Sequence, residues 1–125
     1  MLNNYIENEY AKLWIEDDIL FVVYKNDVSI DLAGAIKIVE DRLFLQQGNA
    51  FLIFCDMRGV KSADKAARNY LAFEGSVLIK AVALLINNPL SYIISGFYLK
   101  TSKPIISTNV FTDEAKALTF LRSFT

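Results

Sequence analysis

Histidine is absent from this 125-residue sequence, and cysteine occurs once. Without histidine the protein lacks the usual general base near neutral pH, the Ser-His and Cys-His nucleophile pairs, and the commonest metal ligand. The single thiol, Cys55, cannot form an intrachain disulfide, and with no histidine to join it a zinc site is not expected. The five glycines are isolated, so there is no glycine-rich phosphate loop. We therefore expect no metal, no cofactor and no enzymatic activity.

An excess of charge of one sign is also lacking. The sequence has 13 Lys and Arg against 14 Asp and Glu, a net charge of −1, and no run of basic residues. This balance gives no electrostatic reason for binding nucleic acid or an anionic membrane. The acidic run Glu16-Asp17-Asp18 is interpreted as a solvated turn rather than a calcium site or an acid/base pair.

Long apolar runs are missing too. The runs extend over roughly six to eight residues, far short of the ~20 that cross a bilayer, so no integral membrane segment is expected. Residues 1–9 have no positive charge followed by an apolar stretch, unlike a secretory signal. A lone cysteine suits a reducing compartment. We expect a cytoplasmic protein, and the 54% hydrophobic content indicates a folded domain rather than a disordered chain.

The first half of the sequence predicts a β-hairpin followed by a helix. Tyr10–Glu16 and Ile19–Lys25 have the composition of strands, and the two residues Asp17-Asp18 between them form a short turn. Asp31–Gln47 has a helical pattern, with Asp31 as the N-terminal cap and Gly48 at the end. The apolar residues that recur on one face of this helix, and are expected to point inward, are Leu32, Ile36, Val39 and Leu43.

Two later runs, Ala50–Cys55 and Ala81–Ile86, are apolar throughout. Strands of this kind are buried on both faces, as in a parallel sheet covered by helices, so the two runs are expected to be neighbouring, parallel and central. Ser62–Glu74 between them has a helical pattern, which completes a βαβ unit with a right-handed crossover.

The C-terminal third predicts a helix, a strand and a helix. Asn88-Pro89 opens the first helix, Lys103–Phe111 is the strand, and Thr112 caps the last helix. The predicted fold is therefore one α/β domain over residues 10–125, preceded by a polar tail at Met1–Glu9. It has a mixed sheet of about five strands that starts with a hairpin and has a buried parallel centre, covered by about four helices.

Three stretches of the chain carry a family resemblance: Phe51–Val60, Ser62 with Ala67-Arg68, and Thr112–Ala115. In these stretches, and in the order of its elements from Leu13 onward, the sequence resembles the STAS superfamily (sulphate transporter and anti-sigma-factor antagonist), especially its small stand-alone bacterial members. Anti-sigma antagonists carry an Asp-Ser-(Ser/Thr)-Gly stretch whose serine is phosphorylated by a partner kinase. The corresponding stretch here, Val60–Asp64, is shorter, with one serine and no glycine.

The resemblance implies a non-enzymatic regulatory or protein-interaction module. Divergent relatives described as STAS/Sec14-like imply the alternative, a binder of a small apolar ligand or lipid that associates with membranes. An enzyme is the third hypothesis, and the sequence supports it least.

The candidate switch loop runs from Asp56 to Ser62. Asp56 ends a buried strand, and ligands gather at the carboxyl ends of parallel strands; the alternative is that its carboxylate accepts N–H groups of the following loop. Gly59 permits the turn. Ser62 either caps the next helix or is a phosphoacceptor. In the second case Arg58, Lys61 and Arg68 lie close enough in sequence to pair with a phosphate; the alternative is that they are ordinary surface charges.

A second candidate site is the wide apolar stripe of the helix that follows Pro89. It is interpreted as core, with two alternatives: a homodimer contact, or a cover over an apolar pocket. The stripe consists of Leu90, Ile93, Ile94, Phe97 and Tyr98.

Overall fold

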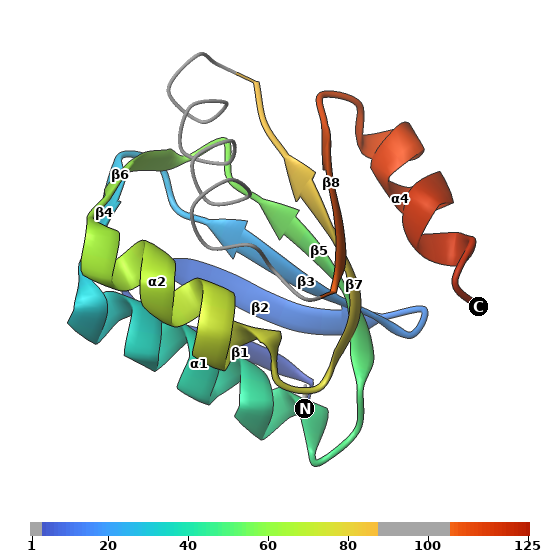
Figure 1. Ribbon diagram of the computed structural model, residues 1–125, viewed down its shortest axis with the longest axis horizontal. Helices are drawn as coiled ribbons and strands as arrows, with labels where there is room; N and C mark the ends of the chain where they lie inside the picture. Colours follow the sequence, from blue (N-terminus) through green and yellow to red (C-terminus); the bar gives the residue numbers. More distant parts are fainter. Residues whose placement is uncertain (1–3, 88–105) are drawn as a thin grey trace.

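The structure is a computed structural model that describes residues 4–87 and 106–125 (Figure 1). The described strands are β1 (Tyr5–Glu7), β2 (Ala11–Glu16), β3 (Ile19–Tyr24), β4 (Val28–Ile30), β5 (Phe51–Asp56), β6 (Val60–Ala63), β7 (Ile79–Leu85) and β8 (Ser107–Phe111). The described α-helices are α1 (Leu32–Gln46), α2 (Lys65–Phe73) and α4 (Glu114–Arg122), and a short 3-10 helix, η1 (Glu74–Ser76), follows α2.

The main sheet has six strands in the order β1-β2-β3-β5-β7-β8. The first three are antiparallel, whereas β3, β5, β7 and β8 are parallel. The two fully apolar runs form β5 and β7, which pair in parallel at the buried centre, as their composition predicts. Strands β4 and β6 form a separate small parallel pair. The predicted mixed α/β fold with a parallel centre is confirmed.

Helices cover both faces of this sheet (Figure 1). Alternate residues of the strands point to opposite faces. One set, which includes Leu20, Ile53 and Val82, packs with residues of α1 and α2. The other set packs with Ala117 and Leu121 of α4; its strand residues are Ile19, Leu52, Phe54, Ala81, Ala83 and Leu85.

A row of aromatic side chains crosses the sheet on the α4 face. Backbone register aligns Tyr5 with Trp14, Trp14 with Phe21, and Phe21 with Phe54. The Trp14 and Phe21 rings are stacked, with centroids 5.2 Å apart and an interplanar angle of 5°. Phe21 in turn lies 5.1 Å from Phe54, which is buried. These contacts tie the antiparallel strands to the parallel centre.

The hairpin turn and the ends of α1 follow local chemistry. Asp17 and Asp18 both have positive φ, 52° and 64°, which is the backbone of a type I′ turn. The Asp31 carboxylate accepts the Gly34 N–H at 2.8 Å and caps α1. The helix ends at Gln47 and Gly48, both in the left-handed region, where glycine is unstrained.

The predicted inward face of α1 is right only in part. Val39 is buried and Leu43 half-buried, but Leu32 is 42% exposed and Ile36 39% exposed. The buried face also includes the polar residues Asp41, Arg42 and Gln46. These polar residues are buried because they find partners far away in the sequence. For example, Asn8 donates to Asp41 at 2.9 Å, and Gln46 donates to the Leu78 carbonyl at 2.7 Å.

Three further expectations about the fold need adjustment. The segment expected as a tail, residues 1–9, contains β1, which pairs with β2 and makes the sheet six-stranded. The expected strand Lys103–Phe111 is described only as β8, since residues 103–105 lie outside the described residues. The expectation of about four helices is slightly high for the described residues, which contain three; the helix expected over residues 88–98 lies outside them.

Candidate functional site

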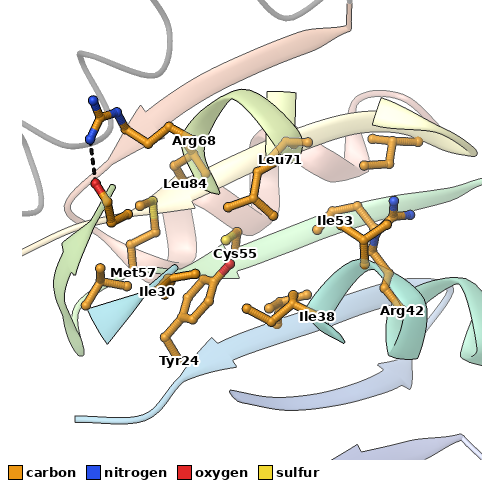
Figure 2. A pocket seen from close by; sticks show the side chains of 16 residues that line it. Tyr24, Ile30, Ile38, Arg42, Ile53, Cys55, Met57, Arg68, Leu71 and Leu84 are labelled. Atoms are coloured by element: carbon orange, nitrogen blue, oxygen red, sulfur yellow. Dashed lines mark hydrogen bonds between the residues drawn. The ribbon is translucent and has the colours of Figure 1, made fainter. Parts of the chain in front are cut away.

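A pocket of about 100 Å³ lies between the main sheet and helices α1 and α2 (Figure 2). Apolar side chains make most of its wall. The lining residues are Val22, Tyr24, Ile30, Ile38, Val39, Arg42, Ile53, Cys55, Met57, Val60, Ala63, Arg68, Leu71, Ile79, Val82 and Leu84.

The floor of the pocket follows from strand alternation. Val22, Cys55 and Leu84 are aligned across β3, β5 and β7, so their side chains point to the same face of the sheet. Ile53 and Val82 form the next aligned row on that face. Val22 and Cys55 have shorter side chains than Leu84 in the same row, and this leaves space between the sheet and the helices above it.

Cys55 is the thiol among the described residues that line the pocket, and its surroundings suppress its reactivity as a nucleophile. Burial and, as a smaller effect, the neighbouring charge of Asp56 raise the pKa of the thiol to about 12. A hydrogen bond with Tyr24 acts in the opposite direction and is the smallest effect. Because only the thiolate is nucleophilic, Cys55 is inert near neutral pH.

Two guanidinium groups stand at opposite ends of the pocket (Figure 2). Arg42 is 4% exposed; it donates to the side-chain oxygen of Gln46 and, at 3.1 Å, to the Val77 carbonyl. These bonds join α1 to the segment that leads into β7. Arg68, from α2, is half-buried and donates to the Ala63 carbonyl.

The carboxylate of Asp56 is engaged rather than open to a ligand. It is 6% exposed and accepts the Arg58 backbone N–H at 3.0 Å. The Arg58 guanidinium binds both of its oxygens, at 2.9 and 2.7 Å, and this pairing raises the pKa of Arg58. The expectation that Asp56 accepts an N–H from the following loop is confirmed. The Asp56 side chain lies on the α4 face of the sheet, away from the pocket, because it alternates with Cys55.

Gly59 is required for a close approach. A Cβ at this position would lie 2.4 Å from the Lys25 carbonyl oxygen, which is backbone and cannot move aside. The Gly59 carbonyl also accepts the Val28 N–H at 3.2 Å. The residue therefore lets the β5–β6 connection pack against the segment before β4, and its value at this site is the missing side chain rather than a positive φ.

Ser62 does not begin a helix, so that prediction is wrong. It lies in β6, exposed, and its hydroxyl donates to the Ser29 hydroxyl of β4 at 3.0 Å. Helix α2 begins at Lys65, and its cap is Asp64, whose carboxylate accepts the Ala67 N–H at 2.8 Å. Pairing of β6 with β4 keeps Ser62 extended and moves the helix start two residues downstream.

Other candidate residues are placed as follows. The apolar stripe of Leu90, Ile93, Ile94, Phe97 and Tyr98 lies outside the described residues, so its proposed roles stay predictions. Within residues 4–87 and 106–125, no group of three or more Cys, Asp or Glu side chains is arranged to hold a metal ion. In the same part of the chain, no helix has the length and apolarity that crossing a membrane requires.

The sequence alone did not identify Tyr24 or Arg42 as site residues, and it pointed to Arg68 only as a possible partner of a phosphate at Ser62. Tyr24 belongs to the alternating pattern of β3 and could have been assigned to one face. Arg42 gave no such signal, because a charged residue inside an amphipathic helix is normally solvated.

Comparison with known proteins supports the fold. The model of a family described as a domain of unknown function, DUF7793, matches residues 13–125. Curated proteins give no match. A similar solved structure is that of an uncharacterized protein from the DUF3478 family, with a SpoIIAA-like fold, from Shewanella loihica PV-4. It shares 13% identity at a TM-score of 0.61, and the alignment covers 93% of this chain and 98% of that chain. At this identity the likeness shows the fold alone, and it confirms the STAS-like prediction.

Proposed function

We propose that this chain, which belongs to the DUF7793 family and has a SpoIIAA-like fold, is a non-enzymatic regulatory module. In this proposal it binds a small apolar ligand between its sheet and helices α1 and α2. The single observation that carries this proposal is the pocket of about 100 Å³ with a largely apolar wall. The interior of a domain is normally packed with few voids larger than a water molecule. A partly open space of this size between the sheet and two helices leaves apolar side chains in contact with water, which a bound apolar ligand would displace.

The energetic cost of the space supports a ligand. At ~24 cal/mol per Å³ for an enclosed cavity, leaving this partly open pocket empty costs at most about 2 kcal/mol of stability. An apolar molecule that fills it restores the lost contacts, so binding and folding are linked. An apolar cavity of ~150 Å³ admits benzene, so a pocket of about 100 Å³ suits a smaller apolar group.

The chemistry around the pocket supports binding without turnover. The sequence has no histidine. The Cys55 thiol is protonated because burial raises its pKa to about 12. The Asp56 carboxylate is held by Arg58 on the other face of the sheet. None of these groups is placed to act as a nucleophile or a general base on a molecule in the pocket.

A matched pair of substitutions tests the proposal. Val22 lines the pocket, whereas Val23 is half-buried and points to the other face. Butan-1-ol added to the wild type should shift the NMR signals of the pocket methyl groups, and Val22→Phe should abolish the shift by filling the space. Val23→Phe, with the same added bulk on the other face, should retain it. If Val22→Phe does not fold, Ala63→Leu at the half-buried edge of the pocket serves the same purpose. No shift in the folded wild type at saturating butan-1-ol would refute the proposal.

A second candidate function is contact with another protein through the Asp56–Ser62 segment, with Ser62 as a phosphoacceptor. The favouring observation is that Ser62 and Ser29 are both exposed on the small β4–β6 sheet, where a kinase can reach them. Mass spectrometry of the protein from its native host would test this. A phosphopeptide containing Ser62, together with a change in partner binding by Ser62→Asp and not by Ser62→Ala, would support it.

A further inference from the structure

The charged side chains among the described residues that line the pocket are two arginines, Arg42 and Arg68, and none of these lining residues is acidic. In an apolar setting the attraction of a positive charge for an anion is much stronger than in water. The lining therefore complements a ligand that has an apolar body and a negative charge.

The two arginines differ in their burial and in the hydrogen bonds that their guanidinium groups donate. Arg42 is almost fully buried and joins α1 to the segment before β7, so its place is fixed by the fold. Arg68 is half-buried at the other end, and it donates to the Ala63 carbonyl at the end of β6, two residues before its own helix begins (Figure 2). A guanidinium carries five N–H donors in a planar fork, which suits the two oxygens of a carboxylate. A ligand whose head group lies at Arg68 would place its apolar part over Cys55 and Leu84.

We propose that the pocket takes a short-chain carboxylate, or a molecule with the same pairing of a short apolar body and an anionic head, and that Arg68 binds the head group. This inference rests on the function proposed above and narrows it from apolar ligands in general to anionic ones. The pocket volume of about 100 Å³ limits the enclosed part of the ligand to roughly four heavy atoms, by comparison with the ~150 Å³ that admits benzene, so the carboxylate head lies outside this volume, at Arg68. Butanoate is a probe of that size, and butan-1-ol is its uncharged counterpart.

The test compares the two probes by NMR titration of the pocket methyl groups. A charge-assisted hydrogen bond makes wild type bind butanoate about tenfold more tightly than butan-1-ol. Arg68→Gln should remove this preference and leave the affinity for butan-1-ol unchanged, whereas Arg68→Lys should keep part of it. Lys65→Gln removes a charge from an exposed position of the same helix, and should keep the full preference. If Arg68→Gln does not fold, Arg68→Met replaces it.

The outcomes separate this inference from the function on which it rests. Equal affinity for the two probes in wild type, or a preference that survives Arg68→Gln, overturns the anionic ligand and leaves the apolar pocket in place. A preference lost equally in Lys65→Gln also overturns the role of Arg68, because the charge then acts from outside the pocket. If neither probe shifts the pocket methyl groups of wild type, both the inference and the proposed function fail.

Discussion

The start of α2 provides the sharpest test of the structure. Its nine residues leave their first N–H groups without helical partners, and Asp64 satisfies one of them by accepting from Ala67 at 2.8 Å. Asp64→Ala should therefore destabilise the protein by about 0.5–2 kcal/mol. Ser62→Ala should cost no more than about 0.5 kcal/mol, because it removes only an exposed hydroxyl contact with Ser29.

Equilibrium urea unfolding followed by far-ultraviolet circular dichroism measures both changes. With a slope of ~1–3 kcal/mol per molar urea, a loss of 1 kcal/mol lowers the midpoint by about 0.3–1 M. Asp64→Asn is the matched control, since asparagine caps as well as aspartate, and any remaining loss reports the interaction of the charge with the helix dipole. A Ser62→Ala variant that loses as much stability as Asp64→Ala would show that the helix begins at Ser62 and that the argument is wrong.

Two other predictions concern the hairpin and the buried thiol. Replacing Asp17-Asp18 by Asn-Gly should raise stability by about 0.5–1 kcal/mol, because both positions have positive φ and glycine adopts it without strain; an unchanged or lower urea midpoint would contradict the turn assignment. Above the unfolded pKa of ~8.5, the unfolded chain releases the Cys55 proton while the folded protein, with a pKa of about 12, retains it. The free energy of unfolding should therefore fall as the pH rises between these two pKa values. The fall should be steeper in wild type than in Cys55→Ala by about 1.4 kcal/mol per pH unit. Urea midpoints that change in parallel for the two proteins at pH 8, 9 and 10 would refute the burial of the thiol.

The centre of the fold was predictable because its signal is local. β5 and β7 are apolar at nearly every position, and such strands are stable only where both faces are covered. The outer parts were harder. β1 has three residues and forms a strand because it pairs with the edge of β2. The local sequence pattern does not indicate this pairing. Of the aliphatic residues assigned to the inward face of α1, Leu32 and Ile36 are exposed, whereas Arg42 and Gln46 are buried through bonds to distant carbonyls.

The candidate site was predictable only in part. The bond from the loop to Asp56 follows from the position of that residue at the end of a strand, and the sequence shows that position. The caps of α2 and α4 were both assigned too early, to Ser62 and Thr112. In each helix an aspartate a little further along performs the task, since its charged carboxylate competes better for the N–H groups than a hydroxyl does. The pocket could not be predicted, because its existence depends on how the helices lie over the sheet.

The stacked pair of Trp14 and Phe21 gives the molecule a built-in spectroscopic probe. Trp14 is the single tryptophan of the sequence, so the indole emission of the protein has one source. Its ring lies on the α4 face, where Phe21 stacks on it and Glu16 accepts its N–H at 3.2 Å. Emission from this ring therefore follows the separation of β2 from β3 during unfolding. The sheet lies between the indole and the pocket, so a ligand bound under α1 and α2 should not change the tryptophan fluorescence. Fluorescence titrations would therefore miss binding that the NMR signals of the pocket methyl groups detect.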